Sequence, residues 1–302
     1  MKGISIVFNL YLPDKHILEK ILESFERQEI NSQIELIVID KKTDEIGKNM
    51  IKKFSKIAKR IKTRNIKVDS KLNFAESMNI GLKQAKHDKI VVIQQDCIPS
   101  SKQWLKNLVT PLEKRDIVAT TSRVIYPREL WDSMNVFTKS IMLNERGIIT
   151  PRLDEKACGY KKEIFRKIGF FNENEFRTAG EDYDLYLKLK KIGKIAYPDA
   201  SVYHYHPMNL KNRIAKIKQY SNGFGVLFRK NGIYLPRWYS GLVKSIPVLG
   251  IVGFILAFPY KKGISLFPIY LLLTPLLNLN YMIGFWKGFL GRKQEIDIFP
   301  NT

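Results

Sequence analysis

Asp96 is the residue of this sequence whose position most clearly favours ligand chemistry. It follows four apolar residues, 90–93, which are mostly β-branched and predict a buried strand. Pro99, shortly after it, cannot continue a central strand. Ligands of open α/β sheets bind outside the carboxyl ends of the strands, so a carboxylate there could take part in binding. The structural alternative is that Asp96 caps a helix that begins near Ser100.

The elements that would position Asp96 alternate between strands and helices. Apolar runs and helical periodicity predict strands at residues 4–8, 34–40, 66–68 and 89–93, and helices at residues 17–25, 45–62 and 74–85. Alternation at this short spacing is typical of a parallel α/β sheet. Asp40 ends the second strand, where a ligand-binding role is again expected and a plain turn residue is the alternative.

The balance of charge and cysteine narrows the class of protein. The 302 residues contain 51 Lys and Arg against 29 Asp and Glu, a formal net charge of +22. This favours nucleic acid, an anionic membrane or phosphorylated substrates as partners, and no nucleic-acid-binding motif supports the first.

Two cysteines, Cys97 and Cys158, indicate a reducing compartment. Residues 4–12 contain Asn9 and lack a cleavage-site pattern, so we expect a strand there rather than a signal peptide.

The composition changes after Pro207. Residues 208–240 form a basic connector, in which an amphipathic helix is expected to end near Gly223 and Gly225. Residues 241–290 contain two charge-free stretches, 16 residues at 245–260 and 24 residues at 263–286. The second is long enough to cross the ~30 Å apolar core of a bilayer. We therefore expect a membrane-associated helical hairpin at 241–290, followed by a tail at 291–302, with two buried core helices as the alternative.

A series of motifs along residues 3–207 carries a family resemblance. The motifs are the strand at 4–8, Ile37 to Asp40, Asn79-Ile80-Gly81, Gln94-Gln95-Asp96, Gly169 to Glu173, Gly180 to Leu185, and Val202 to Pro207. In this order they resemble the family 2 glycosyltransferases, which have the GT-A fold. The resemblance implies a Rossmann-like nucleotide-diphospho-sugar transferase domain over residues 1–207. Asn9-Leu10-Tyr11-Leu12 replaces the usual Pro-Thr-Tyr-Asn of the family.

The metal-binding motif also departs from the usual form. The family's Asp-x-Asp appears as Gln94-Gln95-Asp96, a form that resembles the rhamnosyltransferase-like branch. The resemblance implies that Asp96 holds a divalent cation, Mn²⁺ or Mg²⁺, which stabilises the leaving diphosphate. His204 is the second ligand by family position, and its imidazole suits Mn²⁺ better than Mg²⁺. His206 has the same parity in a strand and is the alternative ligand.

Zinc is a weaker expectation for the same residues. Asp96 and Cys97 together with His204 and His206 would supply four ligands, but their spacing matches no structural zinc pattern. A small buried role for Cys97 is the simpler reading.

The resemblance also assigns the donor and acceptor sides. It implies that the nucleotide sugar is bound by a set of residues at the strand ends: Asn9, Tyr11, Asp40, Asn79, Gln95 and Asp96. Asp182 would be the general base that takes the proton of the acceptor hydroxyl, with Glu181 in support. The structural alternative is that acidic residues in a first helical turn complement the helix dipole, and we assign that role to Asp184.

Together these features predict a metal-dependent, inverting glycosyltransferase at the cell membrane. Its acceptor would be a lipid-linked or membrane-borne glycan, and the Lys and Arg flanks of the apolar stretches favour a catalytic domain on the cytoplasmic side. The basic segment at 48–67 could then contact anionic headgroups. Two alternatives remain: a polyprenyl-phosphate glycosyl synthase, and a catalytically silent sugar-nucleotide or glycan-binding module, which Gln94 suggests.

Overall fold

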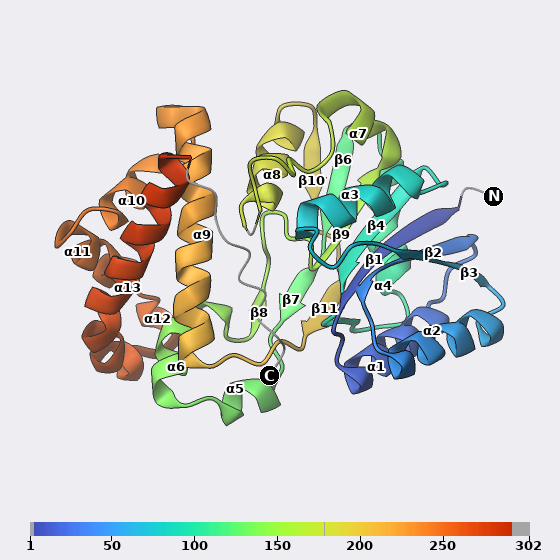
Figure 1. Ribbon diagram of the computed structural model, residues 1–302, viewed down its shortest axis with the longest axis horizontal. Helices are drawn as coiled ribbons and strands as arrows, with labels where there is room; N and C mark the ends of the chain where they lie inside the picture. Colours follow the sequence, from blue (N-terminus) through green and yellow to red (C-terminus); the bar gives the residue numbers. More distant parts are fainter. Residues whose placement is uncertain (1–2, 178, 292–302) are drawn as a thin grey trace.

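A seven-stranded sheet forms the centre of the protein in the computed structural model, which describes residues 3–177 and 179–291 (Figure 1). Its order is β10-β6-β9-β4-β1-β2-β3. The strands are β1 (Ile4–Tyr11), β2 (Ile34–Lys42), β3 (Ile61–Lys67), β4 (Lys89–Gln94), β6 (Ile117–Thr121), β9 (Ala157–Lys161) and β10 (Lys194–Ala196). Only β9 runs antiparallel to its neighbours in this described sheet. The predicted α/β sheet is confirmed.

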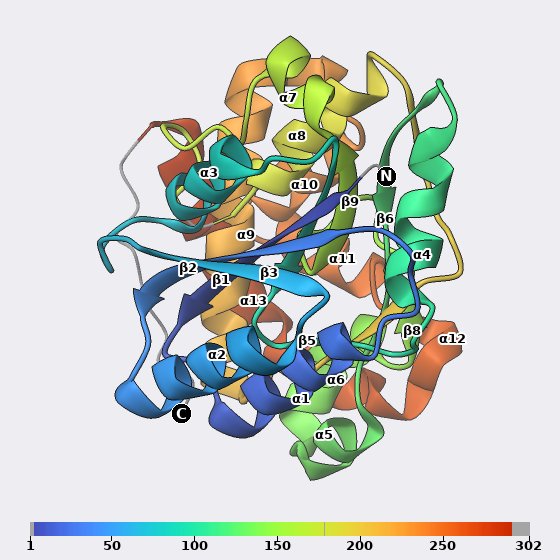
Figure 2. The ribbon, with the colours of Figure 1, turned by 90° about the vertical axis from the view of Figure 1, so that its right-hand side faces the viewer.

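Helices cover both faces of this sheet (Figure 2). One face packs against α1 (Lys15–Glu26), α2 (Glu45–Ile57) and α4 (Trp104–Val109), and the other against α3 (Phe74–Gln84), α7 (Lys162–Ile168) and α8 (Glu181–Lys190). Strand β1 contributes to the hydrophobic core on each face of the sheet. Phe8 packs in the core on the α1 side, and its neighbour Val7 packs in the core on the α3 side. A strand buried on both faces needs apolar residues at consecutive positions, as the sequence has.

Two element boundaries differ from the sequence prediction. Helix α2 ends at Ile57 and β3 begins at Ile61, so the basic residues expected in one long helix belong partly to a strand. Strand pairing explains the difference, because Ile61 is buried and lies opposite Ile34 of β2.

Gly81 in α3 has a packing role, since a Cβ there would lie 2.4 Å from Val7 Cγ1.

A second, four-stranded sheet lies at the carboxyl end of β4. Its order is β5-β11-β7-β8, formed by β5 (Cys97–Pro99), β11 (Ser201–His204), β7 (Arg123–Ile125) and β8 (Ile148–Ile149). Strand β11 pairs antiparallel with β5, so that His204 stands opposite Cys97. This pairing joins residues more than 100 positions apart. Two short helices, α5 (Arg128–Ser133) and α6 (Val136–Met142), follow β7.

The C-terminal helices form a layer beyond α9 (Leu210–Asn231), at the end of the molecule opposite β3 (Figure 1). They are α10 (Trp238–Lys244), α11 (Leu249–Leu256), α12 (Tyr260–Gly263) and α13 (Phe267–Phe289). The expected helix end near Gly223 and Gly225 is wrong, because α9 continues through both. These glycines allow close contacts: a Cβ at Gly225 would lie 2.1 Å from the Phe285 carbonyl oxygen of α13.

The predicted hairpin of two apolar helices is not what the described residues show. Residues 245–260 contain only the eight-residue α11, which Pro247 precedes and Pro259 follows. In the described part of the chain, one helical segment, Tyr260–Phe289, is long and apolar enough to cross a membrane, with a mean hydropathy of 1.5. Length and composition alone are weak evidence of a span. Residues 292–302 of the predicted tail lie outside the described residues.

Candidate active site

Asp96 lies in the tight turn between β4 and β5, and a polar clamp holds this turn. The Tyr11 backbone nitrogen donates to Gln95 Oε1 at 2.7 Å, and Gln95 Nε2 donates back to the Tyr11 carbonyl at 2.8 Å. The Tyr205 nitrogen donates to the Asp96 carbonyl at 2.7 Å. The ends of β1 and β11 are therefore fastened on either side of Asp96. The Gln95 side chain is engaged with Tyr11 in this way.

Two histidines converge on the Asp96 carboxylate. Oδ2 of Asp96 lies 3.3 Å from His204 Nε2 and 3.1 Å from His206 Nδ1. The two imidazole rings are stacked, with centroids 5.6 Å apart, because residues two apart in an extended segment project to the same side. Burial by itself would raise the pKa of Asp96, but the charges and hydrogen bonds of His204 and His206 hold that pKa well below its usual range.

Lys216 of α9 distinguishes the two histidines. Its Nζ lies 3.0 Å from His206 Nε2. Burial lowers the pKa of Lys216 to about 8, so the ammonium form prevails at neutral pH and donates to Nε2. The other ring nitrogen of His206, Nδ1, faces Asp96 Oδ2 at 3.1 Å. Both His206 nitrogens are thus engaged, which leaves His204 as the imidazole better able to bind a cation with Asp96.

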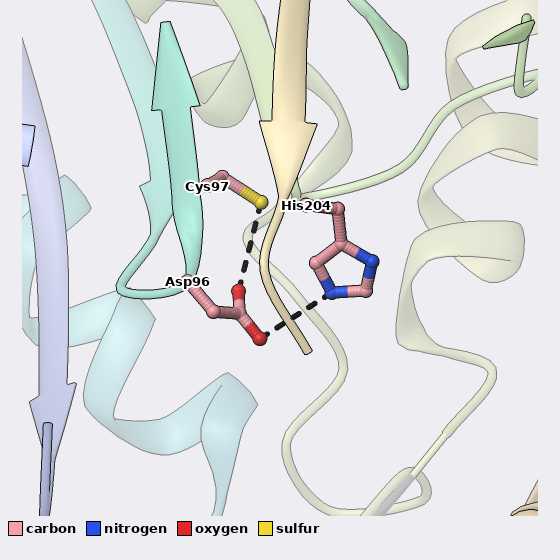
Figure 3. Close-up of side chains that lie close together, drawn as sticks. All are labelled: Asp96, Cys97 and His204. Atoms are coloured by element: carbon pink, nitrogen blue, oxygen red, sulfur yellow. Dashed lines mark hydrogen bonds and ion pairs between the residues drawn. The ribbon is translucent and has the colours of Figure 1, made fainter. Parts of the chain in front are cut away.

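Cys97 completes the cluster as a buried thiol. Donor atoms of Asp96, Cys97 and His204 lie within 4.8 Å of one another (Figure 3). Cys97 Sγ donates to Asp96 Oδ1 at 3.6 Å, and burial, followed by the Asp96 charge, raises the thiol pKa. A carboxylate oxygen with one imidazole nitrogen fits Mn²⁺, and this donor set is less suited to Mg²⁺.

Glu181 and Asp182 open helix α8 as a pair of adjacent acids, of which Glu181 is buried and Asp182 is half-buried. Gly180 precedes them in the left-handed region, with φ of 99°. Burial, then the Asp182 carboxylate, raises the pKa of Glu181 to about 8. Burial, then the Asp154 carboxylate, raises the pKa of Asp182 to about 6. At neutral pH Glu181 is therefore protonated, whereas Asp182 is an ionised group with unusual basicity.

Three further charged residues, Asp154, Glu155 and Lys156, belong to the same region. Lys156 Nζ pairs with Asp154 Oδ2 at 2.6 Å. Its positive charge acts to lower the pKa of both His204 and Asp182, which couples these two residues electrostatically. Glu155 is buried, and its Oε1 has no hydrogen-bond partner among the described residues.

The analysis of the sequence missed these three residues and Lys216. The available signal was the run Asp154-Glu155-Lys156 immediately before the apolar residues of β9. Nothing local marks Lys216, which is one of several lysines on a basic helix.

The remaining predicted donor residues fall into two groups. Asn9 and Asp40 lie at the carboxyl ends of the neighbouring strands β1 and β2, and each has an Oδ1 without a hydrogen-bond partner in the described residues. Asn79 is occupied within the protein. Its Oδ1 accepts from the Phe171 nitrogen at 3.1 Å, and its Nδ2 donates to Glu173 Oε2 at 2.6 Å. It therefore fastens α3 to the loop that leads toward α8.

Asp184 differs from the expected helix cap. It is buried, and its carboxylate pairs with Lys188 at 2.7 Å and with Lys230 of α9 at 3.3 Å. A Cβ at Gly223 of α9 would lie 2.3 Å from the Ala179 carbonyl, immediately before Gly180. Helix α9 therefore contacts both sides of the candidate site, near His206 and near the start of α8.

Comparison with protein families supports the resemblance. A model described as glycosyl transferase family 2 matches residues 5–169, which is more than half of the chain. No curated protein matches the chain.

Several solved structures share the fold at low identity. The mannosyltransferase PcManGT from Pyrobaculum calidifontis, in complex with GDP-Man and Mn²⁺, has a TM-score of 0.67 at 13% identity, over 97% of this chain and 88% of that one. GalNAc-T7 with UDP, GalNAc and Mn²⁺ has a TM-score of 0.59 at 14% identity, over 89% of this chain and 54% of that one. S. aureus TarS 1–349 with UDP-GlcNAc has a TM-score of 0.53 at 14% identity, over 98% and 94%.

Proposed function

This chain belongs to glycosyl transferase family 2, and we propose that it transfers a sugar, with inversion, from a nucleoside-diphosphate donor to an acceptor hydroxyl. One observation carries the proposal. The Lys156 charge acts both on His204, which contacts Asp96, and on Asp182, and we therefore treat the Asp96–His204 pair and the acids Glu181 and Asp182 as one site. A cation-binding group and a basic carboxylate are the two parts that this reaction needs. Solved structures of similar fold in complex with GDP-Man and Mn²⁺, and with UDP-GlcNAc, support this reaction class.

The leaving-group side would use Asp96 and His204 to hold Mn²⁺, or Mg²⁺ with weaker preference. The bound cation would supply positive charge against the negative charge that develops on the departing diphosphate. His206, locked between Asp96 and Lys216, would orient the carboxylate. The Lys216 ammonium would add a fixed positive charge to the same side.

The nucleoside side would use the free oxygens at the strand ends. Asn9 and Asp40 each offer a buried acceptor oxygen, which suits the hydroxyls of a ribose or the N–H groups of a base. The Tyr11 ring would stack on the base, while Gln95 holds the Tyr11 backbone in position. Asn79 would act indirectly, through the loop that it fastens.

The acceptor side would use Asp182 as the general base. Asp182 accepts the proton of the acceptor hydroxyl, the hydroxyl oxygen forms a bond to the anomeric carbon, and the bond from that carbon to the diphosphate breaks. A pKa of about 6 makes Asp182 ionised at neutral pH and more basic than an ordinary aspartate. Glu181, with a pKa of about 8, would remain protonated and donate a hydrogen bond. A phosphate acceptor needs no such base, so these pKa values favour a hydroxyl acceptor over a polyprenyl phosphate.

The acceptor is proposed to be a lipid-linked or membrane-borne glycan, reached from the cytoplasmic side of the cell membrane. The support is the large apolar C-terminal region, which the catalytic domain does not need for its own core. The sugar, the base and the rhamnosyltransferase-like placement stay predictions.

A thermal-shift panel tests the proposal most directly. Full-length protein is heated with GDP, UDP, dTDP or CDP, each with and without Mn²⁺. We expect one diphosphate to raise the melting temperature, and Mn²⁺ to increase that shift, because a ligand that binds only the folded state stabilises it. The matching nucleotide sugar is then assayed for transfer and slow hydrolysis. A silent binding module would show the thermal shift without either reaction, and no shift with any nucleotide would contradict the proposal.

A further inference from the structure

We infer that the C-terminal layer formed by α10, α11 and α13 docks on an anionic lipid surface, with α13 lying along the membrane rather than crossing it. The first observation is where exposed apolar side chains gather. Of 26 large apolar side chains exposed in the described residues, 17 lie after residue 231. Scattered exposed apolar residues are ordinary, but such a concentration in one layer indicates a contact surface.

Six exposed apolar side chains on α13 and directly after it form one continuous stripe, and Leu271 beside it is also exposed. The six recur at spacings of four, three, four, three and four residues: Leu272, Leu276, Leu279, Ile283, Trp286 and Leu290. This is the period of one helical face, and it runs for about 27 Å along the helix. The opposite face is buried and includes Leu273, Leu277 and Phe285. The neighbouring α11 segment adds a second exposed row of Val248, Leu249, Val252 and Leu256.

The positive charge of the C-terminal layer favours an anionic lipid surface as its binding partner. Residues 232–291 contain five basic residues, Arg237, Lys244, Lys261, Lys262 and Lys287, and no acidic residue. Anionic headgroups complement this charge around an apolar surface. A second copy of the chain would instead bring two positively charged layers together. The composition therefore favours a membrane over a dimer interface.

The contacts of α9 determine how α13 meets the membrane. A Cβ at Gly284 would lie 2.1 Å from the Lys218 carbonyl, and one at Gly288 would lie 2.0 Å from the Asn222 carbonyl. Residues 218–222 of α9 therefore run beside residues 284–288 of α13 at the same level. If α13 crossed a bilayer, this part of α9 would have to enter the apolar core with it.

Helix α9 cannot enter the bilayer core unless the part of the catalytic domain that it contacts enters with it. Lys216 contacts His206, Arg229 pairs with Glu175 at 2.6 Å, and Lys230 pairs with Asp184. Charged groups at membrane depth are costly, and here they also hold the site together. An in-plane α13 avoids this cost, since its stripe faces lipid while α9 lies on the side of the catalytic domain (Figure 1).

In-plane docking would hold the acceptor side at a constant height above the membrane, because Gly223 of α9 packs on Ala179 before Glu181 and Asp182. This consequence rests on the proposed function, whereas the docking itself does not. Lipid-linked acceptors could then be presented to a site that does not move relative to the bilayer.

Vesicle flotation tests the surface. Full-length protein is mixed with vesicles of phosphatidylcholine alone or with phosphatidylglycerol, and the floated fraction is measured. The test variant is Leu256→Glu with Leu272→Glu, at positions 77% and 72% exposed, and the control is Ile148→Glu, 62% exposed on β8 of the catalytic domain. We expect wild type and control to float with anionic vesicles, and the test variant to bind about tenfold more weakly because a buried charge opposes insertion. Two results would overturn the inference. One is equal flotation of all three proteins, and the other is a soluble wild-type dimer that does not float with either kind of vesicle.

Depth measurements separate lying along the membrane from crossing it. A nitroxide is attached at Leu272→Cys, Leu279→Cys or Leu290→Cys, since the native Cys97 and Cys158 are buried. In-plane docking predicts similar shallow depths at all three positions. A spanning helix predicts depths that differ by up to about 27 Å over these 18 residues, and that result would refute the inference. The nucleotide-induced thermal shift, measured without vesicles on the same variants, reports the proposed function independently.

Discussion

Asp182→Asn should slow transfer strongly while making the protein more stable. Burial and Asp154 raise the pKa of Asp182 from 3.8 to about 6. The folded state therefore binds this proton more tightly than the unfolded state, so stability falls as pH rises from about 4 to 6 and stays lower above that. A shift of this size corresponds to about 3 kcal/mol at neutral pH, as an upper limit. An asparagine carries no charge, and its Oδ1 can still accept from the Tyr183 nitrogen, so much of that cost is removed.

The same substitution removes the base. An amide cannot take the hydroxyl proton, so turnover at saturating donor should fall about 10²–10⁴-fold with donor affinity nearly unchanged. In the wild type, turnover should rise with pH to about 6 and then level, as Asp182 ionises. The assays are transfer kinetics between pH 5 and about 8, and urea unfolding at neutral pH.

A surface carboxylate supplies the control for this prediction. Asp116, which pairs with Lys194 at 3.0 Å, is largely exposed, and Asp116→Asn should alter neither turnover nor stability appreciably. Asp184 is unsuitable because it is buried between two lysines. If Asp182→Asn lost both activity and stability, Asp182 would be a structural residue. If it kept normal turnover, the base would lie elsewhere or the acceptor would already be ionised.

Three further predictions concern the cation, the α8–α9 contact and the α9–α13 contact. Asp96→Ala should abolish the Mn²⁺-dependent part of the nucleotide thermal shift in a folded protein, and His204→Ala should weaken it less; an unchanged Mn²⁺ response in the Asp96 variant would refute the cation assignment. Asp184→Asn should lower the free energy of unfolding by about 1–3 kcal/mol, measured in urea, because two lysines lose their charged partner. Gly288→Val should lower the melting temperature, since its Cβ would lie 2.0 Å from the Asn222 carbonyl; a neutral effect would mean that α9 and α13 are not closely packed.

Local pattern was sufficient for strands β1, β2 and β4 and for the residues at their ends. Residues 34–40 and 89–93 are strands in the structure because apolar β-branched runs need burial on both faces of a parallel sheet. Asp40 ends the first of these runs and Asp96 lies three residues after the second, so chain order alone assigned them to one edge of the sheet. His204 was found from motif order rather than from pattern, and its contact with Asp96 required the pairing of β11 with β5.

Tertiary structure decided the rest of the site, because its members meet through contacts distant in sequence. Lys156, whose charge acts on both His204 and Asp182, directly precedes β9, which inserts antiparallel beside β4. Lys216 reaches His206 only because α9 continues past its glycines and packs on the catalytic domain. A glycine in a helix costs about 1 kcal/mol, which local reasoning counts against a helix, but at Gly223 and Gly225 it permits contacts that no side chain could allow. Composition identified the apolar C-terminal region. How this region meets a membrane depends on the packing of α13 beside the charged α9, and a hydropathy profile carries no information about that contact.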